Sequence, residues 1–483
     1  MKLAREYPSS KLRGKKVLVV GLGRSGAAAA RAAANLGATV TVTDSKSAAA
    51  LADLAALLPA GVARQLGGHV RQSFLDAELI VLSPGVPLLP EIAAAEAAGV
   101  PMVGELELGA RLVEAPIAAV TGTNGKSTTT TLLGAMVAAT GRPTFVGGNL
   151  GVPLCEAVGS PAARAGGALV LEVSSFQLER TPTFAPAVAV LLNVTPDHLD
   201  RYPDFAAYVA AKAQILAHQR AQDAAVLNAD DEVVRTLGEK LRARPFWFST
   251  RRQPSGGAAG KAPATEPPLA AFCEGETLCV SLDGRTIERY AAAGGALVGR
   301  HNRENALAAV LAARLYGAPA RAVAEGLAGF RPLAHRMALV ADVDGVRYYD
   351  DSKATNVGAA VAALDGFPAP VVLIAGGRDK GGSYVPLASV LQTVGRAVVL
   401  IGEAAERIHA ALGQAAPVSR AGSMAEAVAL ARGLARPGDA VVLSPACSSF
   451  DMFRDYAHRG EVFSEAVRAQ AGTADSSPAG GGK

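Results

Sequence analysis

Residues 119–129 read AVTGTNGKSTT, an apolar segment that leads through a glycine loop into a run suited to a helix. Backbone N–H groups in such a loop surround phosphate oxygens, and the start of the following helix adds positive potential. Lys126 supplies a cation for the β- and γ-phosphates, and the Ser127 hydroxyl is a ligand for Mg²⁺. A helix start that carries a lysine by chance is the alternative. The succession of strand, loop and helix favours a binding site for ATP.

The glycine spacing of this loop departs from the common phosphate-binding motif. The common form, GxxxxGK followed by Ser or Thr, has four residues between its glycines. Here only two residues separate Gly122 from Gly125, and Val120 occupies the position of the first glycine. The loop is therefore a shortened variant.

Short apolar runs, each followed or preceded by an Ala-rich helical window, recur on both sides of the loop. Strand, turn, helix and strand in this order form βαβ units, which predict parallel sheets. The runs fall into three groups, and a length of 483 residues also suggests about three domains. We therefore predict an α/β protein of three domains, each with a mostly parallel sheet flanked by helices. The runs are 16–20, 39–43, 79–82, 116–121, 169–172, 188–192, 371–377, 398–402 and 440–444.

We place the domain boundaries where a helix or loop leads into a new strand. The predicted domains are 1–105, 106–332 and 333–471. Residues 251–269, RRQPSGGAAGKAPATEPPL, are typical of a flexible surface insertion, and residues 472–483 are typical of a disordered tail.

Composition excludes several classes of protein. Hydrophobic residues make up 50% and charged residues 19%, which is not the signature of a disordered chain. A net charge of +4 suits anionic small molecules and does not suggest a nucleic-acid partner. Four scattered cysteines give no disulfide framework or zinc motif. The first residues are polar, and no run of ~18 uncharged apolar residues occurs in the sequence. We therefore expect no association with a membrane. We expect a cytosolic monomer.

A second glycine motif lies near the N-terminus. Gly21, Gly23 and Gly26 follow a strand and open a helix, and Asp44 ends the next strand. This is the fingerprint of a dinucleotide site, in which the carboxylate binds a ribose. Taken alone, it indicates a nicotinamide dehydrogenase. The alternative is a tight turn that serves only the packing of helix on strand.

The shortened loop GTNGKS resembles that of the Mur ligase superfamily, which comprises ATP-dependent amide-bond synthetases of cell-wall and folate metabolism. The resemblance covers about residues 15–466. It implies a Rossmann-like N-terminal domain, a central domain like that of P-loop ATPases, and a Rossmann-like C-terminal domain. It also implies ATP and two Mg²⁺ ions as cofactors.

Two strand ends carry candidate metal ligands. Glu172 ends a strand beside the loop, where a Mg²⁺ ligand belongs in a nucleotide sheet. His198 follows another strand in NVTPDHLD, and a lone histidine there is either structural or a metal ligand. The resemblance assigns NVTxDHxD to the second magnesium. With Ser127, these residues form the expected metal set.

Lys212 falls within an apolar stripe at helical spacing, together with Phe205, Tyr208 and Ile215. Burial of an ammonium is costly and lowers its pKa. A lysine that extends its ammonium to solvent at the helix edge is the alternative. In many Mur ligases the lysine at this place reacts with CO₂, and the carbamate ligates Mg²⁺. We therefore expect Lys212 to be carbamylated and to be catalytic, with Lys126 and His198.

The resemblance extends the ATP site beyond the loop. Asn302 and Asn305 lie three residues apart in HNRENA, where helix capping by Asn302 is the alternative to an adenine contact. Arg336 and Asp351 suit a clamp on phosphate and ribose, and ordinary surface ion pairs are the alternative. The expected ATP site contains Gly122, Thr123, Asn124, Gly125, Lys126, Ser127, Thr128, Thr129, Asn302, Asn305, Arg336 and Asp351.

The last third of the chain indicates which ligase this is. DDSKATN at 350–356 and SPACSSFD at 444–451 are similar to the forms in superfamily members that add D-glutamate. D-Glutamate has two carboxylates, so its site needs a cation and hydroxyl or amide donors. Tyr456 stands where those members usually have Phe. The expected D-glutamate residues are Thr355, Lys380, Ser449, Phe450 and Tyr456.

The same resemblance gives the first domain the uridine of a UDP-linked substrate instead of NAD. It implies ATP-driven addition of D-glutamate to UDP-N-acetylmuramoyl-L-alanine through an acyl phosphate, in peptidoglycan precursor synthesis. Another ligase of the superfamily, a dehydrogenase and a P-loop switch are the alternatives. The expected UDP-substrate residues are Arg24, Ser25, Asp44, Ser45, Lys46, Gly85 and Asn149.

Overall fold

The computed structural model describes residues 12–199, 201–252, 267–291, 299–331, 333–365 and 367–474. Most of the insertion expected at 251–269 and of the tail expected at 472–483 lies outside these residues. Three sheets, of five, nine and six strands, confirm the predicted α/β architecture. By its contacts the chain divides into two units. The first contains the residues up to 194, 209–294 and 304–330, and the second contains 195–208, 295–303 and the residues from 331 onward.

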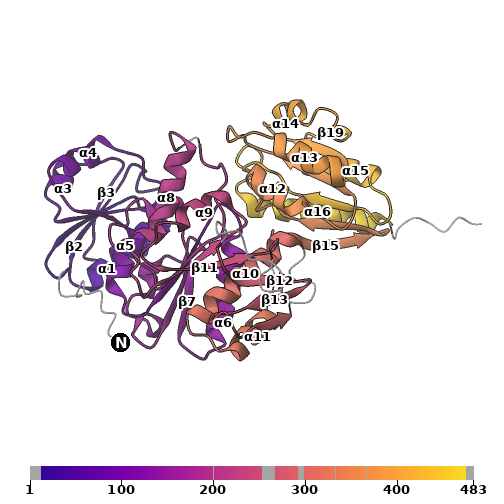
Figure 1. Ribbon diagram of the computed structural model, residues 1–483. Coiled ribbons are helices and arrows are strands. Elements are labelled where there is room, and N and C mark those ends of the chain that lie inside the picture. The colour runs from indigo at the N-terminus through magenta and orange to yellow at the C-terminus, as the bar shows by residue number, and fades with distance from the viewer. Residues whose placement is uncertain are drawn as a thin grey trace, which may run out of the picture. The chain divides into compact units, whose positions relative to one another are not determined.

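The first sheet is entirely parallel, in the order β3-β2-β1-β4-β5. Because β1 lies between β2 and β4, the direction of winding reverses there, and ligands bind at such points of α/β sheets. Figure 1 shows the helices of the N-terminal part of the chain around this sheet. Its strands are β1 (Lys16–Val20), β2 (Thr39–Asp44), β3 (Ala63–Leu66), β4 (Leu79–Leu82) and β5 (Met102–Gly104); its helices are α1 (Arg24–Asn35), α2 (Ala52–Ala56), α3 (Arg71–Leu75), α4 (Pro90–Ala97) and α5 (Glu105–Leu112).

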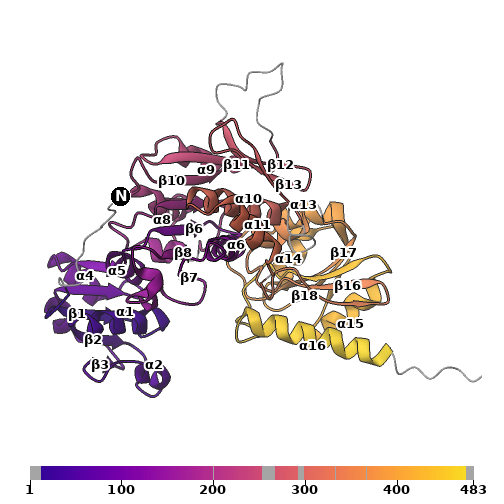
Figure 2. The ribbon, with the colours of Figure 1, turned by 90° about the horizontal axis from the view of Figure 1, so that it is seen from below.

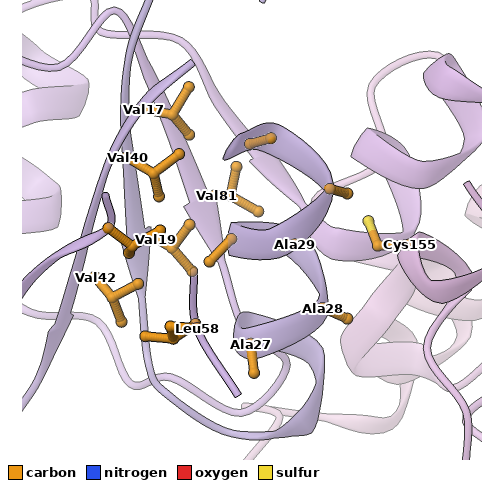
Figure 3. Close-up of a cluster of buried hydrophobic side chains, with 14 of the residues drawn as sticks. Val17, Val19, Ala27, Ala28, Ala29, Val40, Val42, Leu58, Val81 and Cys155 are labelled. Atoms are coloured by element: carbon orange, nitrogen blue, oxygen red, sulfur yellow. The ribbon is translucent and has the colours of Figure 1, made fainter. Parts of the chain in front are cut away.

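Alanines on α1 let this helix pack closely against the sheet. Figure 3 shows valines of β1, β2 and β4 on one side of the alanine-rich α1 and Cys155 on its other side, and all of these side chains are buried. Gly26 is required at the start of the helix, since a Cβ there would overlap the carbonyl oxygen of Gly21. The helix begins at Arg24, directly after the second glycine of the motif, Gly23.

The second sheet carries the glycine loop at the end of a central strand. Its order is β14-β13-β12-β11-β10-β9-β6-β8-β7, and only β13 and β14 join by antiparallel pairing. The sequence analysis predicted β6, β8 and β9 of this sheet and did not predict β7 or β10 to β14. The strands are β6 (Ile117–Thr121), β7 (Thr144–Gly148), β8 (Ala168–Glu172), β9 (Val188–Leu191), β10 (Ala224–Asn228), β11 (Arg244–Ser249), β12 (Leu269–Glu274), β13 (Thr277–Val280) and β14 (Glu288–Ala291).

The helices of the second sheet include the one that begins at the glycine loop. A Cβ on Gly326 of α11 would overlap the backbone of Met136 in α6, so these two helices pack in close contact. The helices are α6 (Lys126–Ala138), α7 (Ser175–Leu178), α8 (Phe205–Ala217), α9 (Glu232–Gly238), α10 (Arg300–Leu315) and α11 (Ala320–Ala328), with short 3₁₀ turns at Leu154–Ala157 and Pro161–Ala163.

The third sheet has the order β15-β16-β20-β17-β18-β19, and only β15 is antiparallel. Leu373 of β17 packs with α12, α13 and α14, whereas Val372 packs with α15 and α16, as the alternation of a buried strand requires. Figure 2 shows α16 along one face of this sheet. The elements are β15 (Ala338–Val343), β16 (Val346–Asp350), β17 (Val371–Gly376), β18 (Gly395–Ile401), β19 (Val418–Arg420), β20 (Ala440–Leu443), α12 (Val357–Leu364), α13 (Val385–Val394), α14 (Ala405–Leu412), α15 (Met424–Leu434) and α16 (Tyr456–Ala474).

Among the described helices, none is both long enough and apolar enough to span a lipid bilayer.

Candidate active site

The glycine loop follows β6 and closes onto the first residue of α6. Gly125 has a left-handed backbone, with φ of 86°, and a Cβ there would overlap Oδ1 of Asn305. Asn193, after β9, holds the loop from the other side. Its carbonyl accepts from Thr123 N at 2.9 Å, and its side-chain Oδ1 accepts from Asn124 N at 2.8 Å. The structure thus fixes the loop with a residue that the sequence analysis quoted but gave no role.

Two lysines donate to the same carbonyl group of this loop. Lys126 Nζ donates to Gly122 O at 2.9 Å and to Thr123 O at 2.7 Å. Lys212 Nζ, from α8, donates to Gly122 O at 2.8 Å. Lys212 is only 2% exposed, so it does not extend to solvent as a lysine at a helix edge would. Two cationic side chains therefore face the phosphate loop from different helices.

Glu172 at the end of β8 is a buried carboxylate that is only half satisfied. Its Oε1 accepts from Asn149 Nδ2 at 2.6 Å, and its Oε2 has no hydrogen-bond partner among the described residues. Buried polar atoms are normally hydrogen-bonded, so such an oxygen suits a bound cation. The described residues contain no group of three His, Cys, Asp or Glu side chains that would hold a metal alone. A site of one carboxylate, Ser127 and substrate phosphates fits Mg²⁺, which usually keeps few protein ligands.

Asn305 and its neighbour connect α10 to the phosphate loop. Asn305 is buried, and its carbonyl oxygen lies 3.4 Å from Thr129 Oγ1. Asn228 donates to Leu192 O at 2.8 Å and to the carboxylate of Glu304. The end of β9 and the start of α10 are thereby joined by one buried amide, which the sequence analysis missed. Asn302 belongs to the other unit.

His198 lies in the segment 195–208, which contacts place in the second unit, whereas Glu172 and Lys212 belong to the first. His198 has a left-handed backbone, with φ of 55°, and its N–H donates to Asp197 Oδ1 at 2.9 Å. Burial of Asp197 acts to raise its pKa, but Lys380 and His198 together hold that pKa below the ordinary value. The expected metal set is therefore divided between the two units.

The loops of the C-terminal candidate site follow three neighbouring parallel strands, β16, β20 and β17. Arg378 and Ser448 pair their backbones across two of these loops, with N···O distances of 2.9 and 3.2 Å. Phe450 is 66% exposed and follows the buried Ser449. Lys353 Nζ lies 3.7 Å from the centre of the Tyr456 ring. Expected amino-acid residues thus converge at one edge of this sheet.

Asp351 is buried at the same edge. Its Oδ2 accepts from Ser444 Oγ at 2.8 Å. Burial raises the pKa of Asp351 to about 7, although Ser444 and Arg336 act in the opposite direction. Asp350 next to it contacts His335 Nδ1 at 2.6 Å, and a Cβ on Gly460 would overlap both of those atoms. Gly460 was not singled out from the sequence.

Asp44 orders the turns of the first sheet. Its Oδ2 accepts from Leu22 N at 2.7 Å, and its Oδ1 accepts from Lys46 N at 2.8 Å. Ser83 Oγ donates to Gly21 O at 2.6 Å, which joins the turns after β1 and β4 at the reversal point. Gly85 has φ of 84°, and Arg24 and Lys46 are exposed. Asn149, by contrast, lies in the second sheet region and bonds Glu172.

Comparisons with known proteins agree with these features. Residues 15–104 match the family described as Mur ligase MurD-like, N-terminal domain. Residues 120–313 match the Mur ligase middle domain, and residues 335–447 match the Mur ligase, glutamate ligase domain. The UDP-N-acetylmuramoylalanine–D-glutamate ligase of Anaeromyxobacter dehalogenans is 49% identical over 467 residues, which cover 95% of this chain and 99% of that protein. The chain belongs to the Mur ligase family.

Other members of the family give the same result. The UDP-N-acetylmuramoylalanine–D-glutamate ligase of Geotalea daltonii is 45% identical over 465 residues, covering 95% of this chain and 99% of that protein. The structure of a pseudomurein peptide ligase type C from Methanothermus fervidus has a TM-score of 0.61 at 18% identity and covers 95% of this chain and all of that one. At that identity the likeness concerns the fold alone. The family expected from GTNGKS and the three-domain fold are confirmed, and the dehydrogenase alternative is not supported.

Proposed function

We propose that this chain adds D-glutamate to UDP-N-acetylmuramoyl-L-alanine, with ATP hydrolysed to ADP and phosphate, in cytoplasmic peptidoglycan precursor synthesis. The observation that carries the proposal is identity of 45–49% over almost the whole chain to ligases named for this reaction. A phosphate loop and an amino-acid site in one chain fit that chemistry. We further propose that the chain acts as a monomer.

The reaction needs activation because a carboxylate is a poor electrophile. The substrate carboxylate attacks the γ-phosphorus, the bond to the β-phosphate oxygen breaks, and an acyl phosphate and ADP result. The amine of D-glutamate then attacks the acyl carbon, and phosphate leaves. We assign Lys126 to neutralise charge that develops on the transferred group, and its bond to Gly122 O in the loop that would hold the phosphates supports this role.

Magnesium would offset the negative charge of the phosphates. The residues that fit it are Ser127 and Glu172 for one ion, with His198 and Lys212 for a second. The orphaned Oε2 of Glu172 supports the first assignment. The second assignment depends on modification of Lys212.

We propose that Lys212 carries a carbamate. Its amine bonds to the carbon of CO₂ and releases one proton, which leaves an anionic group with one N–H. That N–H is sufficient to donate to Gly122 O, the bond made by Lys212 Nζ. Burial and a second lysine on the same carbonyl both disfavour an ammonium at this position.

The carbamate can be tested with ¹³C-bicarbonate. We expect one carbamate carbon signal in the wild-type protein, its absence in Lys212→Ala, and a loss of ligase activity in that variant. A plain amine under bicarbonate, with Lys212→Ala fully active, would disprove the modification.

The substrates are assigned to the three sheets. We propose the uridine diphosphate part for residues 1–105, ATP for 106–332 and D-glutamate for 333–471. The UDP-substrate set is Arg24, Ser25, Asp44, Ser45, Lys46, Gly85 and Asn149. The ATP set combines the glycine loop and Asn305 with Asn302, Arg336 and Asp351. The D-glutamate set is Thr355, Lys380, Ser449, Phe450 and Tyr456.

The decisive experiment measures phosphate release by the purified protein with ATP, Mg²⁺ and UDP-N-acetylmuramoyl-L-alanine while the amino acid is varied. We expect turnover with D-glutamate and little with L-glutamate or L-alanine. Lys126→Met controls for contaminating ATPases. Equal turnover with L-alanine, or turnover without the muramoyl nucleotide, would contradict the proposal.

A further inference from the structure

Arg459 is a fully buried arginine at the first turn of α16, with 0% of its surface exposed. Its Nε donates to Ser352 Oγ at 2.9 Å, and one terminal nitrogen donates to Ser352 O at 2.8 Å. The other terminal nitrogen donates to Cys447 O at 3.1 Å and to Ser448 O at 3.3 Å. One guanidinium therefore joins the loop after β16 to the loop after β20.

A third loop meets the same group. Gly377, directly after β17, has φ of 133°, and a Cβ there would lie 3.1 Å from a terminal nitrogen of Arg459. The three loops carry the residues assigned to the amino acid. Thr355 follows the first, Ser449 and Phe450 belong to the second, and Lys380 belongs to the third.

The chemistry of the contact is unusual for a buried cation. None of the four acceptors is a carboxylate, so among the described residues no opposite charge is hydrogen-bonded to the guanidinium. Asp350, Asp351 and Asp451 favour its charged form only through the field of their charges. Burial lowers the pKa of Arg459 to about 10, which still leaves the side chain charged at neutral pH. Burial of an unpaired charge is costly. A planar fork of five donors at fixed angles provides a geometric benefit that a lysine cannot replace.

We infer that Arg459 is a positioning residue for the amino-acid pocket, which it forms by fixing the loops after β16, β20 and β17 relative to one another. It touches no substrate itself. The inference rests on the proposed function, because that function assigns D-glutamate to these loops.

Arg459→Lys tests the inference, since it keeps the charge and loses the fork. We expect KM for D-glutamate to rise about tenfold or more, as the loss of charge-assisted hydrogen bonds predicts. We expect KM for the muramoyl nucleotide to change less than about twofold, since its assigned loops do not contact this residue. Arg396→Lys is the matched control. Arg396 lies at the opposite edge of the same sheet and binds Asp439 at 2.6 and 2.9 Å.

A second variant and a second measurement cover the case in which Arg459→Lys folds poorly. Ser352→Ala removes one acceptor of Arg459, together with the bond that Ser352 Oγ donates to Tyr456 O at 2.8 Å, and we expect a smaller rise in the same KM. Hydrogen exchange should increase at residues 351–356 and 445–450 in either variant, with the strands before them still protected. This measurement needs no turnover, so it stays informative if the wild type proves inactive with D-glutamate and the proposed function fails. Unchanged KM and unchanged exchange in these loops would overturn the inference, as would an equal rise in KM for D-glutamate and for the muramoyl nucleotide.

Discussion

Asp197 Oδ1 lies 3.6 Å from Lys380 Nζ, and Asp197 Oδ2 accepts from Asn356 Nδ2 at 2.9 Å. Asp197 directly precedes His198, Lys380 follows β17, and Asn356 caps α12. A single buried carboxylate therefore anchors the histidine loop to two loops of the C-terminal sheet. At 3.6 Å the ammonium keeps hydrogen-bond donors for another anion.

Asp197→Asn should weaken D-glutamate binding. The change removes the charge that holds Lys380 while keeping the shape of the side chain. A lysine without its anchor regains rotamer freedom, which costs up to about 2 kcal/mol when a substrate fixes it again. We expect KM for D-glutamate to rise roughly three- to tenfold, with KM for ATP unchanged, in steady-state assays.

Asn also removes a negative charge from a site for a dicarboxylate, and this effect acts to lower KM for D-glutamate. A lower KM for D-glutamate in Asp197→Asn would mean that repulsion, and not anchoring, dominates at this position. Arg407→Lys serves as the control, since Arg407 binds the neighbouring Asp379 from α14 and does not contact Asp197.

Glu172→Gln should separate stability from activity. The wild-type protein buries a carboxylate with one oxygen that has no hydrogen-bond partner in the part of the chain that the structure describes, and this oxygen is costly until a cation binds. We expect the variant to have an equal or higher melting temperature without Mg²⁺. We also expect turnover to fall at least about 100-fold, because a neutral amide is a poor ligand for Mg²⁺. A Mg²⁺ titration of melting temperature with an ATP analogue checks both. A variant that keeps the full Mg²⁺-dependent stabilisation would exclude Glu172 as a ligand.

The sequence predicts β1, β2, β4, β6, β8, β9, β17, β18 and β20 because buried parallel strands are short, apolar and bounded by glycines. Val371 to Gly377 is such a run, and β17 covers Val371–Gly376. The strands β13 and β14 were not predicted because each has only four residues of mixed polarity, TLCV and ERYA. Their strand structure depends on pairing with a neighbouring strand.

The candidate site was predictable only where function depends on a local motif. Lys126 begins the helix after the glycine loop and Glu172 ends a strand, and the sequence pattern reveals both positions. Arg459 and Asp197 act through partners in distant segments, which only the folded chain brings together. The burial of Lys212 was indicated by helical spacing, but the carbonyl that it shares with Lys126 was not.

Substitutions of Tyr456 test whether its ring, which contacts Lys353, contributes more to D-glutamate binding than its hydroxyl does. The ammonium lies 3.7 Å from the ring centre, a cation–π contact worth about 0.5–2 kcal/mol. Tyr456→Phe keeps that contact, and we expect KM for D-glutamate to change less than about twofold. Tyr456→Leu loses it, and we expect a rise of about three- to tenfold. Equal effects of both variants would assign the role to the hydroxyl or to packing.

Glu105 should make the stability of the first unit depend on pH. This residue is 1% exposed, its Oε1 accepts from Cys155 N at 2.7 Å, and its Oε2 has no hydrogen-bond partner among the described residues. Burial raises the pKa of Glu105 from 4.5 to about 7, with the Cys155 bonds acting in the opposite direction. Between pH 4.5 and about 7, Glu105 retains its proton in the native protein and releases it in the unfolded chain. The contribution of this proton is therefore complete below about pH 4.5 and is lost as pH rises to 7.

Glu105→Gln mimics the neutral acid at every pH and so removes this dependence. We expect the melting temperatures of variant and wild type to coincide near pH 5 and to diverge toward pH 8, with the variant more stable. The free-energy difference at pH 8 is at most on the order of 3 kcal/mol. Glu107→Gln is the control, because Glu107 on the same helix is buried with Arg111 and Thr183 as partners, and its loss should destabilise the fold at both pH values. Parallel curves for Glu105→Gln and wild type would show that Glu105 is ionised in the native protein, and the penalty of its burial would then have to be offset by a cation or water at Oε2.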